Sequence, residues 1–147
     1  MAITSRAEAV WEGDLTSGSG TVRSATSQQL NNLPVSWARR TETLDGKTSP
    51  EELLAAAHAT CFAMALSAGL ARAGTPPRRL ETSAAVTFDR VEAGWRVVSS
   101  ALTVRGQVPG IDAAAFRQAA EAARDGCPIS QALKGNVQLS VEATLAT

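Results

Sequence analysis

The feature that most constrains this fold is one continuous apolar segment at residues 49–71, SPEELLAAAHATCFAMALSAGLA. Its beginning carries the signals of a helix start: Ser49 is placed to cap the helix, Pro50 suits the first helical position, and Glu52 completes a capping box. Gly74, with a Pro-Pro pair soon after it, predicts where the helix ends. We therefore expect one long helix that packs in the core of the protein.

The same segment, over residues 53–71, is about long enough to span a bilayer. It is rich in alanine, contains His58, Thr60 and Ser67, and lies between charged residues, which favours a buried helix of a soluble protein. The N-terminal stretch MAITSRAEAVWEGD mixes charges throughout, so we expect no signal peptide and a cytoplasmic protein. The 14 basic and 14 acidic residues cancel, so charge favours neither a nucleic acid nor a membrane as partner.

Alternating apolar and polar residues predict strands on both sides of this helix. Before it we expect a hairpin around a Ser/Gly turn at 16–20 and a third strand through LPVSWARRTE. After it we expect a hairpin of ETSAAVTFDRV and WRVVSSALTVRGQV, a helix capped by Asp112 and ending at Gly126, a short helix beginning at Cys127, and a last strand in NVQLSVEATLA. The order β-β-β-α-β-β-α-α-β predicts an α+β fold with a mainly antiparallel sheet. With 147 residues, 44% of them hydrophobic, the chain suits a single domain over 1–147.

The two cysteines, Cys61 and Cys127, carry the most reactive side chains in the sequence. In the cytoplasm they are expected to be reduced at rest. Two cysteines distant from each other in sequence and a single histidine make a poor zinc site, so we expect no metal. Cys127, in GCPIS, is predicted at a helix start, where free backbone N–H groups favour a thiolate. Cys61 lies in an apolar helix, where a cysteine more often packs as a small hydrophobe.

A reactive Cys61 needs a cation nearby, and the segment before the long helix offers Arg39 and Arg40. On the predicted strand, alternation sends these two side chains to opposite faces, so one of them points toward whatever the sheet covers. Glu51 is not explained by the capping box, and on a straight helix it lies about 15 Å from Cys61. Glu51 could therefore reach Cys61 only from a second copy of the chain.

His58 is the obvious candidate for a base beside Cys61, three residues before it. No acidic residue is placed to orient its ring, and a buried histidine with satisfied hydrogen bonds is the more common finding. We therefore interpret His58 as part of the scaffold. The three tryptophans are interpreted as core or interface residues.

Taken together, WEGD, the arginine before SPEELLAAAHATCFAMAL, then VPGID and GCPISQAL resemble the OsmC/Ohr family of thiol-dependent peroxidases, and the OsmC branch in particular. The resemblance runs in order over almost the whole chain. It implies the OsmC-like fold, in which sheets wrap around a long central helix in an intertwined homodimer, with active sites at the interface.

By position, the resemblance implies that Cys61 is the peroxidatic cysteine and Cys127 the resolving cysteine. Its glutamate falls on Glu51 and its arginine on Arg40, with Arg39 as the alternative. The implied activity is reduction of organic hydroperoxides, with hydrogen peroxide as a further substrate, in oxidative and osmotic stress defence. It proceeds through a Cys61 sulfenic acid and a Cys61–Cys127 disulfide.

The resemblance also implies that an external dithiol, of the lipoyl type, recycles the disulfide and that no cofactor is required. Two alternatives remain. A thioesterase with a related wrapped helix would leave both cysteines without a purpose, and a non-enzymatic ligand-binding protein of stress adaptation would keep the same fold.

Overall fold

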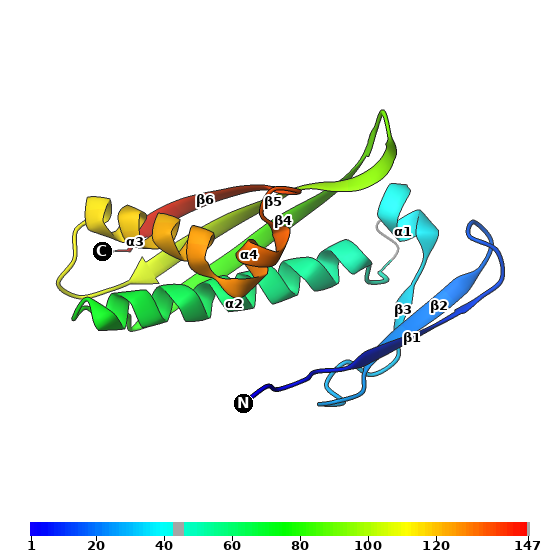
Figure 1. Cartoon of the computed structure of the whole chain (residues 1–147), viewed down its shortest axis with the longest axis horizontal. Helices are drawn as coiled ribbons and strands as arrows, with labels where there is room; N and C mark the ends of the chain where they lie inside the picture. Colours follow the sequence, from blue (N-terminus) through cyan, green and yellow to red (C-terminus); the bar gives the residue numbers. More distant parts are fainter. Residues whose placement is uncertain (43–45, 147) are drawn as a thin grey trace. The chain divides into compact units, whose positions relative to one another are not determined.

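The computed structural model describes residues 1–42 and 46–146, and its contacts divide the chain into two compact units, Met1–Pro50 and Glu51–Thr147. The elements follow the order β1, β2, β3, α1, α2, β4, β5, α3, α4 and β6 (Figure 1). This order confirms the α+β class.

The first unit contains a three-stranded antiparallel sheet in the order β1-β2-β3. Strand β1 (Ala7–Glu12) and strand β2 (Ser19–Ser24) form the expected hairpin, and β3 (Leu33–Val35) pairs with β2. In the turn, Asp14 Oδ1 accepts hydrogen bonds from the backbone N–H of Ser17 at 2.7 Å and from its hydroxyl at 2.8 Å. These contacts close the turn on the Asx pattern.

The predicted third strand is too long, because the chain turns into helix α1 (Trp37–Thr41) directly after β3. The Ser36 side chain caps this helix by accepting a hydrogen bond from the backbone N–H of Arg39 at 3.1 Å. A serine cap satisfies a free amide of a helix start, and this local hydrogen bond prevails over the strand-like alternation. Arg39 and Arg40 therefore lie on a helix, and the expectation that they point to opposite faces of a sheet is wrong.

In the second unit, the long helix α2 (Pro50–Arg72) has the predicted bounds. Its last turn closes where Gly74, with φ +84°, allows the backbone to reverse. There the N–H of Thr75 donates to the carbonyl of Leu70 at 2.9 Å. The capping box of Ser49 and Glu52 stays a prediction.

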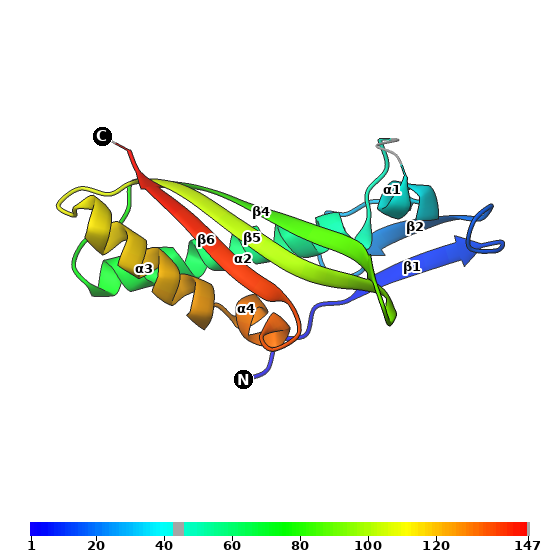
Figure 2. The same ribbon diagram turned by 90° about the horizontal axis from the view of Figure 1, so that it is seen from above.

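The second sheet has the order β4-β5-β6, and Figure 2 shows the three strands side by side. Strands β4 (Arg79–Val91) and β5 (Gly94–Gln107) form the expected antiparallel hairpin. Strand β6 (Gln138–Leu145) pairs with β5 in parallel, with Leu102 opposite Val141. Helices α3 (Ala113–Gly126) and α4 (Pro128–Leu133) form the crossover between β5 and β6.

The core of this unit lies between the sheet and the helices α2 and α3. Buried apolar side chains from these elements pack together in the core. They include Phe62, Leu66 and Leu70 of α2, Leu102 and Val104 of β5, and Phe116, Ala120 and Ala123 of α3. Asp112 caps α3 as predicted, because its side chain accepts a hydrogen bond from the N–H of Ala115 at 2.8 Å.

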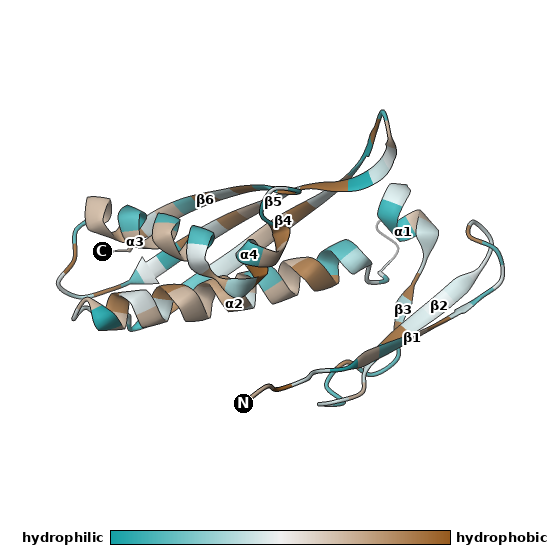
Figure 3. Ribbon diagram, viewed as in Figure 1, coloured by the Kyte–Doolittle hydropathy of each residue, from teal (hydrophilic) through white to brown (hydrophobic). Residues whose placement is uncertain are grey.

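Between its charged ends, helix α2 is mostly apolar (Figure 3). Its buried residues follow one face: Glu51, His58, Phe62, Leu66 and Leu70. Met64, on another face, is 69% exposed. Among the described residues, α2 is the one helix long and apolar enough to span a membrane, a property that it shares with core helices of soluble proteins, and 22% of its apolar window is buried. In a single chain the expected burial of this helix is therefore limited to one face.

Candidate active site

Cys127 lies at the junction of two helices, where it ends α3 and caps α4. Its backbone is extended, Pro128 occupies the first turn of α4, and the backbone N–H of Ser130 donates to the Cys127 sulfur at 3.3 Å. The side chain is 0% exposed. The predicted cap at GCPIS is confirmed, and it holds the sulfur against a backbone amide.

Cys61 is partly buried in the middle of α2, beside this junction. The backbone N–H of Ile129 and the side chain of Cys127 lie near enough to Cys61 to influence its pKa. Of the consecutive residues of α4, Ser130 donates its N–H to the Cys127 sulfur, and the N–H of Ile129 lowers the pKa of Cys61. Both cysteines are free thiols in this structure.

The surroundings of Cys61 favour the thiol over the thiolate. Burial raises the pKa of Cys61, and contact with Cys127 raises it further, while the N–H of Ile129 acts in the opposite direction. Because the thiolate is the nucleophilic form of cysteine, Cys61 needs a positive charge in addition to what these residues provide.

His58, one turn before Cys61, is fully buried and has a partner at each ring nitrogen. Its Nδ1 lies 2.6 Å from Oγ of Ser100 on β5, and its Nε2 lies 2.8 Å from Oγ of Ser130 on α4. Both nitrogens are thus directed at serines rather than at Cys61. Ser130 Oγ in turn lies 3.2 Å from the Cys127 sulfur.

Sequence reasoning missed Ser100 and Ser130. For Ser130 a signal was present, since it stands three residues after a capping Cys127, where a helix start brings the two side chains together. For Ser100 no local signal exists, because its contact with His58 joins a strand to a helix distant in sequence.

Glu51 is buried in the first turn of α2. The same straight helix carries Cys61, about 15 Å further along its axis, so the two side chains of one chain do not meet.

Arg39 and Arg40 lie on α1 of the first unit. Arg39 Nε donates to the carbonyl of Lys47 at 3.1 Å, and the Arg40 guanidinium lies over the Trp37 ring, 5.6 Å from its centroid. Of the predicted site residues, the second unit brings Cys61 and Cys127 near each other.

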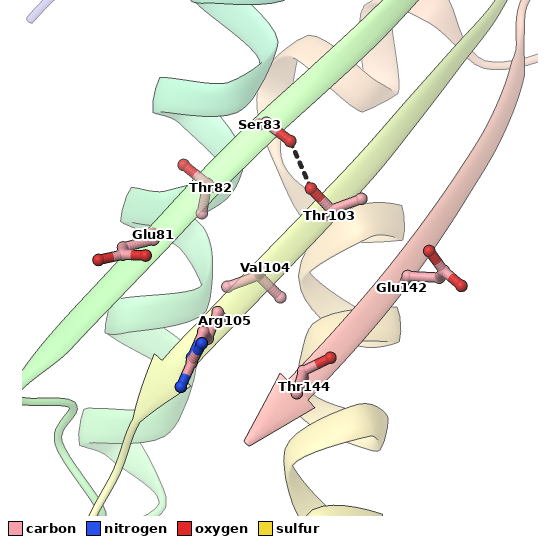
Figure 4. A pocket seen from close by; sticks show the side chains of 8 residues that line it. All are labelled: Glu81, Thr82, Ser83, Thr103, Val104, Arg105, Glu142 and Thr144. Atoms are coloured by element: carbon pink, nitrogen blue, oxygen red, sulfur yellow. Dashed lines mark hydrogen bonds between the residues drawn. The ribbon is translucent and has the colours of Figure 1, made fainter. Parts of the chain in front are cut away.

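A pocket of about 440 Å³ lies elsewhere, on strands β4, β5 and β6, with helices behind them (Figure 4). Its lining is mostly polar and charged: Glu81, Thr82, Ser83, Thr103, Val104, Arg105, Glu142 and Thr144. Ser83 and Thr103 hydrogen-bond to each other across two strands. The lining includes neither cysteine, so this pocket does not surround the thiols.

Known proteins match this chain in sequence and in fold. The model of the family described as OsmC-like protein matches residues 43–142. Peroxiredoxin OsmC of Escherichia coli (strain K12) is 44% identical over 142 residues, which cover 97% of this chain and 98% of that protein. Organic hydroperoxide resistance protein OhrA of Bacillus subtilis (strain 168) is 31% identical over 105 residues, 70% of this chain and 72% of that protein.

Among solved structures, an organic hydroperoxide resistance protein from Elizabethkingia anophelis aligns with a TM-score of 0.78 at 23% identity, over 99% of this chain and 100% of that chain. At this level of identity the similarity concerns the fold. It confirms the α+β architecture, with sheets and a long helix, that the sequence motifs imply.

Proposed function

Because this chain belongs to the OsmC-like protein family, we propose that it is a thiol peroxidase that reduces organic hydroperoxides through Cys61 and Cys127. Its relatives carry the names peroxiredoxin and organic hydroperoxide resistance protein. The observation that best supports the proposal is that the two thiols are neighbours: Cys127 influences the pKa of Cys61, and the N–H of Ser130 on α4 donates to the Cys127 sulfur.

In the first step the Cys61 thiolate attacks the distal oxygen of the hydroperoxide ROOH. A sulfur–oxygen bond forms, the oxygen–oxygen bond breaks, and the leaving alkoxide takes a proton to become the alcohol. Cys61 is left as a sulfenic acid, the first rung of thiol oxidation. Hydrogen peroxide reacts by the same route with water as the product.

In the second step the Cys127 sulfur attacks the sulfur of the Cys61 sulfenic acid. A disulfide forms and one water leaves. The proximity of the two side chains, which makes Cys127 raise the pKa of Cys61, supports this step. An external dithiol of the lipoyl type then restores both thiols by exchange, and no cofactor takes part.

The first step requires a cation, because burial raises the pKa of Cys61. We assign this role to Arg40, with Glu51 orienting its guanidinium, both recruited across the interface of a homodimer. Arg39 is the alternative; its Nε donates to the carbonyl of Lys47, and the Arg40 guanidinium lies over the Trp37 ring. A guanidinium that forms an ion pair with a thiolate lowers the pKa of the thiol.

The exposed apolar surface of α2 supports the homodimer. A helix that is apolar on all faces is normally covered on all faces, and Met64 is 69% exposed in one chain. A second copy would cover this surface and bring Glu51 toward the Cys61 of its partner subunit. Within each subunit the two units would work as one domain over 1–147, in the cytoplasm.

The test follows cumene hydroperoxide loss in the presence of a dithiol for the wild type, Cys61→Ser and Cys127→Ser. We expect no catalysis from Cys61→Ser. In Cys127→Ser, the peroxide should still oxidise Cys61 once. Intact-mass analysis should then show a sulfenic acid or over-oxidised forms. Wild type treated with one equivalent of peroxide should lose two hydrogens. Full activity of Cys61→Ser, or an unchanged wild-type mass, would refute the proposal and favour a binding protein.

A further inference from the structure

A continuous row of buried polar side chains leads away from Cys127 into the core. It runs from the Cys127 sulfur to Ser130 Oγ at 3.2 Å, from Ser130 Oγ to His58 Nε2 at 2.8 Å, and from His58 Nδ1 to Ser100 Oγ at 2.6 Å. All four residues are at most 1% exposed. Three elements, α2, β5 and α4, contribute to the row.

A neutral imidazole carries one proton, so the directions of these hydrogen bonds are linked. With the proton on Nδ1, His58 donates to Ser100, Ser130 donates its hydroxyl proton to Nε2, and the Cys127 thiol donates to Ser130. If the Cys127 proton moves to Ser130 and the Ser130 proton moves to Nε2, every contact is kept. The row can therefore take a proton from Cys127 without breaking a hydrogen bond.

We propose that His58 accepts the proton of Cys127 through Ser130 when Cys127 attacks the Cys61 sulfenic acid. The inference rests on the proposed function and assigns His58 as a positioning residue that acts through Ser130. In this step the bond between the sulfurs forms, and the S–H bond of Cys127 and the S–O bond of Cys61 break. The leaving hydroxide takes up a proton, His58 later releases the one it received, and the products are a disulfide and one water.

The chemistry suits a neutral, buried imidazole. Burial lowers the pKa of His58, and no charged group of the described residues contributes to that shift. The groups that face the ring are the hydroxyl of Ser100 from β5 and that of Ser130 from α4, with the titratable Cys127 behind Ser130 and Cys61 one turn along α2. A thiol that is donating electrons to another sulfur becomes a stronger acid, so a weak base is sufficient.

The test uses a disulfide in place of a peroxide, so that it gives a result even if the peroxidase function fails. The probe 5,5′-dithiobis(2-nitrobenzoate) labels the partly exposed Cys61 and releases one thionitrobenzoate. The attack of Cys127 on labelled Cys61 then releases a second one and forms the internal disulfide. The rate of this second release measures the step in which Cys127 loses its proton.

The variants are Ser130→Ala, which removes the hydroxyl but keeps the backbone N–H, and His58→Gln, which can hydrogen-bond but takes no proton. We expect the second release to slow about 100-fold in both. The wild-type rate should be level above neutral pH, whereas the rates of both variants should rise about tenfold per pH unit as the bulk thiolate forms. Ser130→Thr, which keeps a hydroxyl, should recover most of the rate, and Ser140→Ala on the exposed face of β6 is the matched control.

Wild-type rates in both variants, or slower rates with an unchanged pH profile, would overturn the proposal. If a variant does not fold, the wild type in mixtures of light and heavy water supplies a second measurement. Two protons that move together predict a curved dependence of the rate on deuterium fraction, and a linear or flat dependence would overturn the proposal.

Discussion

A Cβ atom placed on Gly106 of β5 would lie 2.5 Å from Cζ of Phe116 on α3, so strand and helix meet with no room for a methyl group. Phe116 is fully buried in the core. We expect Gly106→Ala to lower the free energy of unfolding by about 1–3 kcal/mol, the usual range for overpacking. Urea unfolding followed by circular dichroism measures the change.

The matched control for this prediction is Gly126→Ala at the end of α3, where an added Cβ meets nothing within 4 Å. This variant should be neutral or slightly stabilising, because alanine favours helix more than glycine does. Equal losses in the two variants would contradict the assigned contact with Phe116.

The pH dependence of stability should identify His58, the single histidine of the chain. Burial lowers the pKa of folded His58 below its ordinary value of 6.5, so below that pH the unfolded chain binds a proton that the folded chain does not. Stability is therefore fully present above pH 6.5 and is lost as the pH falls toward the folded pKa. The slope should reach at most about 1.4 kcal/mol per pH unit.

Unfolding curves at a series of pH values down to about 5.5 provide the measurement, above the range in which most carboxylates titrate. In His58→Gln this slope should vanish. A slope of the same size in that variant would assign it to another group.

Cys127 should influence the protonation of Cys61 before any oxidation. Contact with Cys127 raises the pKa of the Cys61 thiol, although burial is the larger cause. We therefore expect Cys127→Ala to lower the pKa of Cys61. The pH dependence of the iodoacetamide alkylation rate reports this pKa, and a curve displaced to higher pH would contradict the contact.

Substitutions of Arg40 and Arg39 should have different effects on activity and stability. If Arg40 holds the Cys61 thiolate, Arg40→Gln should lower kcat/KM for cumene hydroperoxide about 100-fold and displace the Cys61 alkylation curve to higher pH. Arg39→Gln loses the hydrogen bond from Nε to the carbonyl of Lys47, so it should affect stability more than catalysis. The opposite pattern would assign the site to Arg39.

The exposed face of α2 should control assembly. Met64→Glu puts a charge on a surface that we assign to the subunit interface, since Met64 is 69% exposed in one chain. We expect it to convert dimers to monomers in sedimentation analysis and to reduce peroxidase activity. Gln118→Glu adds the same charge to an exposed position of α3 and should leave the dimer intact.

Local signals explain what could be predicted from the sequence. The bounds of α2, the caps at Asp112 and Cys127, and the β4–β5 hairpin all depend on neighbouring residues, and all were correctly predicted. The prediction of a strand through Trp37 is wrong because Ser36 starts a helix there.

The remaining features depend on contacts between distant segments. Alternation in β6 identifies a strand but not its direction, and the pairing with β5 is parallel. Similarly, the helical sequence around His58 could not reveal that Ser100 and Ser130 occupy both of its ring nitrogens. Of the predicted site, the pairing of Cys61 with Cys127 required the family motifs rather than any local pattern.

The crossover between the parallel strands β5 and β6 also affects the stage of folding at which the two thiols meet. Cys127 lies on the crossover between these strands and Cys61 lies on α2, so no short stretch of chain contains both. Contacts between distant segments form only after the entropy of closing the intervening loop has been overcome. In a newly made chain the two thiols therefore stay apart until the crossover that carries Cys127 has packed beside α2.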